Sequence, residues 1–210
     1  MHNGGIALFG GTFDPIHHGH LLAARAVAEQ LSLDRVVFVP APNPPHKIGH
    51  ELSDAADRLE MVRRAIEGEP RFEVSDIEIR RSGPSYTVLT VQEYRQLVGP
   101  GVPLVWIIGG DSLPELHSWY RVSELVQLCR VVTAVRPSYE MPELTALQGC
   151  LPGPMLEQLK QDVLATPRID ISSTDIRRRI RDGRPIRYLL PDRVIEYIQS
   201  RGLYRCDAIA

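Results

Sequence analysis

Short apolar runs alternate along the chain with longer stretches in which apolar residues recur every three or four positions. Four of the runs are rich in β-branched or aromatic residues and are closely followed by Gly or Pro, which is typical of buried strands. These predicted strands cover residues 6–9, 36–39, 104–108 and 131–135, and the alternating stretch 72–79 predicts a further, more exposed strand. The amphipathic stretches predict helices over 20–31, 54–66, 86–98 and 123–128.

The alternation of strands with helices determines the predicted architecture. A helix between two strands implies a right-handed crossover, so we predict an α/β fold: a doubly wound, Rossmann-like open parallel sheet flanked by helices. Residues 138–166 are the least regular, and they predict a surface excursion before a helix near 156–163. Two short helices, 174–181 and 191–200, predict a small C-terminal helical subregion from about residue 172. Since no stretch resembles a linker, we expect residues 1–210 to form a single domain.

Composition narrows the class of protein. The 210 residues carry a formal net charge of −2, which argues against a dedicated nucleic-acid-binding protein. The longest apolar runs, such as 104–108, are too short to cross a bilayer. Three cysteines without paired spacing and the lack of a secretion signal after Met1 favour a cytoplasmic protein with reduced thiols.

Histidines are concentrated in one Gly- and Pro-rich part of the chain, where five of the seven fall between positions 17 and 50. The first predicted strand leads into a loop that contains Gly10, Gly11, His17 and His20. Glycines let a backbone approach a ligand closely, and the start of the following helix offers N–H groups to an anion. His17 and His20 are three residues apart, so both rings can lie on one face and donate to phosphate oxygens. The loop therefore predicts a phosphate site.

The loop differs from other phosphate-binding and metal-binding patterns. It lacks the Gly-Lys-Ser/Thr ending of a Walker A loop and the Gly-x-Gly-x-x-Gly spacing of a dinucleotide fingerprint. The histidines of the loop have no Cys or carboxylate nearby in the sequence that could join them as further ligands of a metal ion. We therefore predict no metal ligand in the protein.

The segment from Gly10 to His20 resembles the signature of the nucleotidyltransferase superfamily with the His-x-Gly-His motif. Six further motifs are similar, in order, to those of bacterial nicotinate-nucleotide adenylyltransferases, and the chain is identified as a member of that family. They are Pro44-Pro45-His46-Lys47, Pro84-Ser85-Tyr86-Thr87, Ile108-Gly109-Gly110-Asp111-Ser112-Leu113, Trp119-Tyr120, Ile171-Ser172-Ser173-Thr174-Asp175-Ile176-Arg177 and Gly202-Leu203-Tyr204-Arg205.

The resemblance implies transfer of AMP from ATP to nicotinate mononucleotide in NAD biosynthesis, which gives nicotinic acid adenine dinucleotide and pyrophosphate. It implies that His17 and His20 contact the ATP phosphates, with His20 nearest the α-phosphate, and that Asp111 binds the ribose hydroxyls. Arg177 would neutralise phosphate one turn into its helix. The implied ATP set is Gly10, Gly11, Thr12, Phe13, His17, His20, Gly109, Asp111, Ser173, Thr174 and Arg177.

The same resemblance implies a separate set for the second substrate. Trp119 is similar to the family's ring-stacking tryptophan, which suits an electron-poor pyridinium. Thr87, with backbone groups nearby, would bind the nicotinate carboxylate, and such neutral donors would be misaligned by an amide. The implied set is Thr12, His46, Lys47, Tyr86, Thr87, Trp119 and Tyr120.

The expected chemistry needs no general base. The substrate's 5′-phosphate, whose second pKa is about 6, is itself the nucleophile. Catalysis would depend on in-line alignment and on charge stabilisation by His17, His20, Lys47 and Arg177, with Mg²⁺ carried by the ATP phosphates. The expected partners are the two substrates, without nucleic acid or membrane, and a homo-oligomer is left open. The alternatives are an adenylyltransferase for nicotinamide mononucleotide or phosphopantetheine, and a regulator that binds nucleotide without turnover.

Three features stand apart from these assignments. Gly110 occupies a position where relatives often carry a bulkier residue, commonly Ala, which predicts extra room or mobility beside the ribose. His18 takes the variable position of the histidine motif and is given no catalytic role. Six arginines fall between 177 and 187, a pattern that fits a nucleic-acid arm or a solvated helix face; we assign Arg177 to phosphate and most of the others to the surface.

Overall fold

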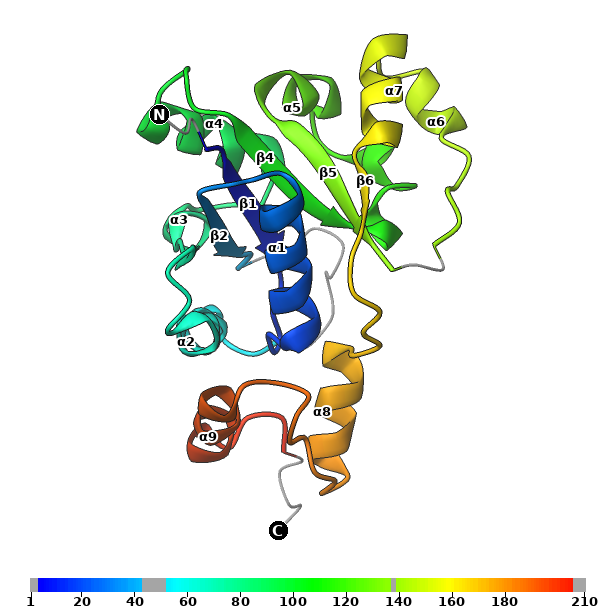
Figure 1. The fold of residues 1–210 in the computed structure, drawn as a ribbon. Coiled ribbons are helices and arrows are strands. Elements are labelled where there is room, and N and C mark those ends of the chain that lie inside the picture. Colours follow the sequence, from blue (N-terminus) through cyan, green and yellow to red (C-terminus); the bar gives the residue numbers. More distant parts are fainter. Residues whose placement is uncertain (1–3, 43–51, 137–138, 206–210) are drawn as a thin grey trace.

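A six-stranded parallel sheet forms the centre of the fold in the computed structural model, which describes residues 4–42, 52–136 and 139–205 (Figure 1). The strands are β1 (Ile6–Gly11), β2 (Arg35–Pro40), β3 (Phe72–Val74), β4 (Leu104–Gly109), β5 (Arg130–Val135) and β6 (Val163–Ala165). Their order in the sheet is β3-β2-β1-β4-β5-β6, and every neighbouring pair is parallel. The predicted doubly wound sheet is therefore confirmed, and its order reverses between β1 and β4.

Helices cover both faces of the sheet because successive side chains of a strand point to opposite sides. In β1, Ile6 and Leu8 pack into one apolar cluster and Ala7 and Phe9 into the other. The first cluster contains residues of α3 (Ile77–Arg80), α4 (Thr87–Val98), α5 (Val122–Leu128), α6 (Thr145–Gln148) and α7 (Gly153–Gln161). The second contains residues of α1 (His18–Gln30), α2 (Ala55–Ile66), α8 (Ser173–Arg181) and α9 (Asp192–Arg201).

The strand predicted over 72–79 is wrong beyond Val74. Ser75 donates its N–H to the carbonyl of Phe38, and the chain then turns into the short helix α3. The hydroxyl of Ser75 accepts from the N–H of Ile77 and so starts this turn. Because the turn buries Ile77 and Glu78 under the sheet, burial outweighs the apparent alternation.

The surface excursion predicted before the helix near 156–163 is also wrong. Leu144, Leu147 and Leu151 are buried in the first apolar cluster. The helix in this region begins at residue 153 and not near 156. Pro154 fits in its first turn because the N–H that proline lacks would have no partner within the helix there. It also ends before residue 163, and the sixth strand, β6, went unpredicted because three residues are too few to show a period.

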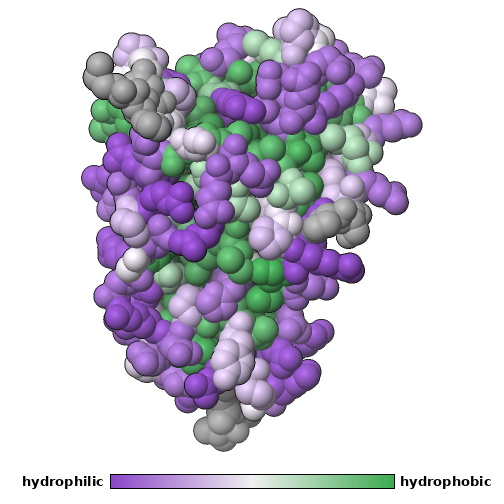
Figure 2. Space-filling model, viewed as in Figure 1, coloured by the Kyte–Doolittle hydropathy of each residue, from purple (hydrophilic) through white to green (hydrophobic). Residues whose placement is uncertain are grey.

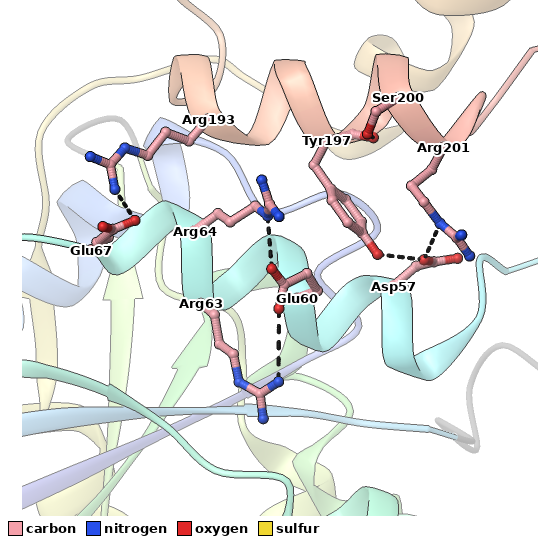
Figure 3. A network of polar contacts seen from close by, with 9 residues as sticks. All are labelled: Asp57, Glu60, Arg63, Arg64, Glu67, Arg193, Tyr197, Ser200 and Arg201. Carbon is pink, nitrogen blue, oxygen red and sulfur yellow. Dashed lines mark hydrogen bonds and ion pairs between the residues drawn. The ribbon is translucent and has the colours of Figure 1, made fainter.

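The C-terminal helices were predicted correctly, and α9 is fixed on α2 by a polar network (Figure 3). Tyr197 donates its hydroxyl to Oδ1 of Asp57 at 2.7 Å, and Nε of Arg201 donates to the same oxygen at 3.2 Å. The guanidinium of Arg64 lies 4.7 Å from the centre of the Tyr197 ring. These contacts join residues 140 and 144 positions apart and attach the C-terminal subregion to the rest of the fold.

The surface of the molecule is mainly hydrophilic on the face that Figure 2 shows. Hydrophilic side chains cover most of the face seen in Figure 2, and hydrophobic ones show between them in a central band. Within the described residues, no helix is both long and apolar enough to cross a membrane.

Candidate active site

Two cavities meet at the carboxyl ends of β1 and β4, where the strand order reverses. The first, the histidine cleft, has a volume of about 680 Å³ and is lined by His17, His20, Arg136, Tyr139, Ser173 and Thr174, among others. The second, the aromatic cavity, has a volume of about 410 Å³ and is lined by Gly11, Thr12, Tyr86, Thr87, Trp119 and Tyr120, among others. Ile108, Gly109 and Asp111 line both. This is the position at which open parallel sheets bind ligands.

The two histidines of the cleft lie together, as their spacing predicts. His17 is the residue before α1 and His20 lies in its first turn, and their rings stack with centroids 3.8 Å apart. The backbone N–H of His17 donates to Nδ1 of His20 at 3.3 Å, which places the proton of a neutral His20 ring on Nε2. Burial, followed by the nearby His18, lowers the pKa of His17 to about 4. At neutral pH His17 is therefore a neutral donor, and the positive charge expected of it is not present in this state.

The start of α8 forms another wall of the cleft. The Ser172 hydroxyl accepts from the N–H of Asp175 and caps the helix, while Ser173 donates its hydroxyl to the carbonyl of Pro15 at 2.8 Å. Arg177 donates from Nη1 to the carbonyl of Asp14 at 2.6 Å. Arg177 is not among the described residues that line either cavity. Its guanidinium holds the loop between β1 and α1, so its predicted phosphate contact would require it to serve both groups.

Asp111 lies in the turn that follows β4, and a tyrosine fixes this turn. Tyr139 donates its hydroxyl to the carbonyl of Gly110 at 3.1 Å. A Cβ added to Gly110 would lie 2.7 Å from Cε2 of Tyr139. The extra room predicted at Gly110 is thus filled by the tyrosine ring. Sequence reasoning missed Tyr139 and Arg136, although the rule that ligands bind beyond strand ends also applies to β5, which they follow.

The aromatic cavity brings together residues from the motifs at 84–87 and 119–120. Tyr86, just before α4, stacks on Tyr120 with ring centroids 4.5 Å apart and an angle of 28° between the planes. Trp119 is half-buried beside the first apolar cluster, and Thr87 begins α4. An aromatic, partly open cavity with hydroxyl and backbone donors suits a flat ring that carries a carboxylate.

Several polar residues that line this cavity were not predicted as site residues, among them Glu78 and Ser85. Glu78 is only 4% exposed, and its Oε1 accepts from the hydroxyl of Thr90 at 2.6 Å. Burial raises the pKa of Glu78. Ser85 lines the same cavity. Nothing in the sequence distinguished Glu78, because the predicted exposed strand placed it among surface residues.

The end of β1 and the loop between β1 and α1 pack closely against aromatic rings. A Cβ on Gly10 would lie 2.3 Å from Cζ2 of Trp106, so only glycine fits there without a shift. Phe13 has a positive φ of 49°, and its buried ring meets the His20 ring edge-on at 5.2 Å. The side chain of Phe13 thus supports the cleft from beneath, and only its backbone can serve the predicted ATP contact. His46 and Lys47 lie outside the described residues.

Acidic residues are sparse around the cleft. Among the described residues, no group of three or more His, Cys, Asp or Glu side chains is arranged to hold a metal ion. Asp111 is the one carboxylate among the described residues that line the histidine cleft. This donor set fits a magnesium ion that keeps water and substrate oxygens as most of its ligands.

Comparisons with known proteins agree with the geometry. A model of the cytidylyltransferase-like family matches residues 8–179. A relative from Desulfitobacterium hafniense, named "Probable nicotinate-nucleotide adenylyltransferase", is 42% identical over 209 residues and 95% of each chain. A relative of the same name from Moorella thermoacetica is 44% identical over 202 residues, covering 96% of this chain and 92% of its own.

A solved structure supports the fold. Plasmodium falciparum nicotinic acid mononucleotide adenylyltransferase, complexed with NaAD, superposes with a TM-score of 0.75 at 18% identity. The match covers 96% of this chain and 97% of that one. At this level of identity the similarity establishes the architecture.

Proposed function

Because this chain belongs to the cytidylyltransferase-like family and, within it, to the nicotinate-nucleotide adenylyltransferases, we propose that it transfers AMP from ATP to nicotinate mononucleotide in NAD biosynthesis. The products are nicotinic acid adenine dinucleotide and pyrophosphate. The observation that carries the proposal is the pair of cavities that meet at Ile108, Gly109 and Asp111. A polar cleft and an aromatic cavity with shared walls let two nucleotides meet without a covalent enzyme intermediate.

ATP occupies the histidine cleft in this proposal. His17 and His20 at the start of α1, and Ser173 and Thr174 at the start of α8, supply donors to the triphosphate. Asp111 accepts from the ribose hydroxyls. The stacking of the two imidazoles directs both rings toward the same part of the cleft, which is what a contact to adjacent phosphates requires.

Nicotinate mononucleotide occupies the aromatic cavity. Trp119, beside the stacked Tyr86 and Tyr120, faces the pyridinium ring, and Thr87 donates to its carboxylate. The 5′-phosphate then points toward Gly11 and Thr12 in the wall of the aromatic cavity. The contributions predicted for His46 and Lys47 stay predictions.

The reaction is a single displacement at phosphorus. An oxygen of the 5′-phosphate attacks the α-phosphorus of ATP, a new P–O bond forms, and the bond to the β-phosphate oxygen breaks with release of pyrophosphate. Because the nucleophile is already anionic, the protein aligns the two phosphates and stabilises the developing negative charge. When bound to the ATP phosphates, Mg²⁺ would supply charge neutralisation there. The neutral His17 donates a hydrogen bond to the departing pyrophosphate. The negative charge of an approaching phosphate favours the protonated form of His17.

One experiment tests the proposal against its rivals. The protein is incubated with ATP and Mg²⁺ and, in separate reactions, with nicotinate mononucleotide, nicotinamide mononucleotide or phosphopantetheine, and pyrophosphate is measured. We expect the fastest release with nicotinate mononucleotide. Preferential release with either other substrate would reassign the enzyme, and nucleotide binding without any release would identify a regulator.

The cytoplasmic location, the single domain and the state of oligomerisation stay predictions. Light scattering of the purified protein measures the state of oligomerisation.

A further inference from the structure

Arg58 on α2 is a buried charge that the proposed reaction does not use. Its side chain is only 1% exposed, yet its guanidinium makes four hydrogen bonds to backbone carbonyls. Nη1 donates to Thr12 at 2.9 Å and to Ala41 at 2.6 Å, Nη2 donates to Pro42 at 3.2 Å, and Nε donates to Ser53 at 3.0 Å. One side chain thus joins the loop after β1, the end of β2 and the segment that leads into α2.

A buried guanidinium is a costly way to hold three segments together. Apolar side chains of similar volume commonly fill such a position with equal or better stability. Unlike an apolar side chain, the planar guanidinium of arginine holds several hydrogen-bond acceptors at defined angles. Burial lowers the pKa of the Arg58 guanidinium, and the nearby carboxylate of Asp14, also buried, opposes this shift. The arrangement therefore specifies a geometry more than it adds stability.

The geometry it fixes is that of the loop amides. In a trans peptide the C=O and the next N–H point in opposite directions. The carbonyl of Thr12 faces Arg58, so the N–H of Phe13 points away from α2. The carbonyl of Gly11 accepts from the N–H of Ala41, which turns the N–H of Thr12 away from β2. Two consecutive N–H groups are thereby held facing away from β2 and α2, at the end of a strand whose Gly11, with the following Thr12, lines the aromatic cavity.

The C-terminal residues reinforce the same loop from another side. Tyr204 donates its hydroxyl to Oδ1 of Asp14 at 2.6 Å, and the N–H of Ser53 donates to Oδ2 at 3.4 Å. Burial and the Asp14 carboxylate raise the pKa of the Tyr204 hydroxyl, which stays a donor. The loop is thus held by Arg58 at Thr12 and by Tyr204 at Asp14.

We propose that Arg58 is a positioning residue for AMP transfer, which orients the backbone N–H groups of Thr12 and Phe13 toward the reacting phosphates. The inference rests on the proposed function and deepens it. Arg58 touches no substrate; it acts through the carbonyls that it binds. A displaced amide donor stabilises the transition state less, so the loss falls mainly on kcat.

The decisive variant is Arg58→Lys, which keeps the charge but cannot span four carbonyls. We expect kcat to fall about 10- to 100-fold, with KM for either substrate changed less than about 3-fold. The matched control is Asp57→Ala, the preceding residue of α2, which breaks the contacts to Tyr197 and Arg201 but removes none of the hydrogen bonds that Arg58 and Tyr204 make to the loop. It should lower Tm and leave kcat within about 2-fold of wild type. Arg58→Lys with a lowered Tm and an unchanged kcat would overturn the proposal.

A second measurement covers the case in which Arg58→Lys does not fold. Backbone amide NMR signals of Thr12 and Phe13 in the wild-type protein should shift when inorganic pyrophosphate is added. Lack of any response at both amides overturns the proposal. The pyrophosphate-release assay on the wild-type protein separates the two hypotheses: an inactive wild type whose amides respond refutes the proposed function alone, and an active wild type with a normal Arg58→Lys refutes the positioning role alone.

Discussion

The rings of His17 and His20 stack at the start of α1, with centroids 3.8 Å apart and 22° between their planes. The first ring is buried and neutral at pH 7, and the second accepts a hydrogen bond from the backbone N–H of the first. The pair therefore presents donors whose positions are fixed before substrate binds. Preorganised donors of this kind are the main means by which a site stabilises charge that develops during a reaction.

Replacing His20 with Ala should reduce kcat on the order of 10²- to 10⁴-fold, because it removes a donor to the phosphate that becomes more anionic. Steady-state pyrophosphate release measures the loss. His18→Ala, two residues earlier, is the control and should retain nearly wild-type turnover. A His20→Ala protein with normal kcat would contradict the assignment of this ring.

The stability of the protein should fall as pH falls from about 6.5 toward 4. The unfolded chain takes up a proton on His17 near pH 6.5, whereas the folded protein does so only near its lowered pKa of about 4. Acid therefore favours the unfolded state by up to about 3 kcal/mol over this window, at about 1.4 kcal/mol per pKa unit. Urea unfolding at pH 7, 5.5 and 4.5 measures the slope. His17→Gln should show a flatter slope, and an unaltered slope would exclude His17 as its source.

Gly110 and Tyr139 should behave as a coupled pair. Gly110→Ala places a Cβ 2.7 Å from the Tyr139 ring and displaces it from the turn that carries Asp111. We expect KM for ATP to rise about 3- to 10-fold, equivalent to about 1 kcal/mol, with KM for nicotinate mononucleotide little changed. Tyr139→Ala removes the obstruction, so the double variant should be no worse than Tyr139→Ala alone. Additive losses would show that the two residues act independently.

Gly10→Ala should destabilise the fold by about 1–3 kcal/mol or more, since the added Cβ would lie 2.3 Å from the buried ring of Trp106. Gly109→Ala is a matched control for stability, because a Cβ there has no heavy atom within 4 Å in the described structure. It should change the free energy of unfolding by less than about 0.5 kcal/mol. Chemical unfolding of both variants provides the comparison, and equal effects would argue against the Trp106 contact.

Sequence patterns predicted the parts of this protein that are properties of contiguous residues. Periodicity placed β1, β2, β4 and β5 and the major helices, because burial on a sheet or helix face repeats at a short, regular interval. The glycines at the end of β1 and the histidines after it were predicted to form a phosphate site for the same local reason. Where burial overrode the local pattern, at residues 75–79, the prediction was wrong, and the strand at 163–165 was missed because it is too short to show a period.

The supports of the site were decided by tertiary structure alone. Arg58 reaches Thr12 across 46 positions, Arg177 reaches Asp14 across 163, and Tyr204 reaches Asp14 across 190. The spacing along the chain does not encode these contacts, because a hydrogen bond depends on distance and angle in space. The sequence by itself predicted which residues carry the chemistry of phosphate binding. Only the folded chain determined which buried groups hold those residues in place, since that depends on how β1, α2, α8 and α9 pack around one loop.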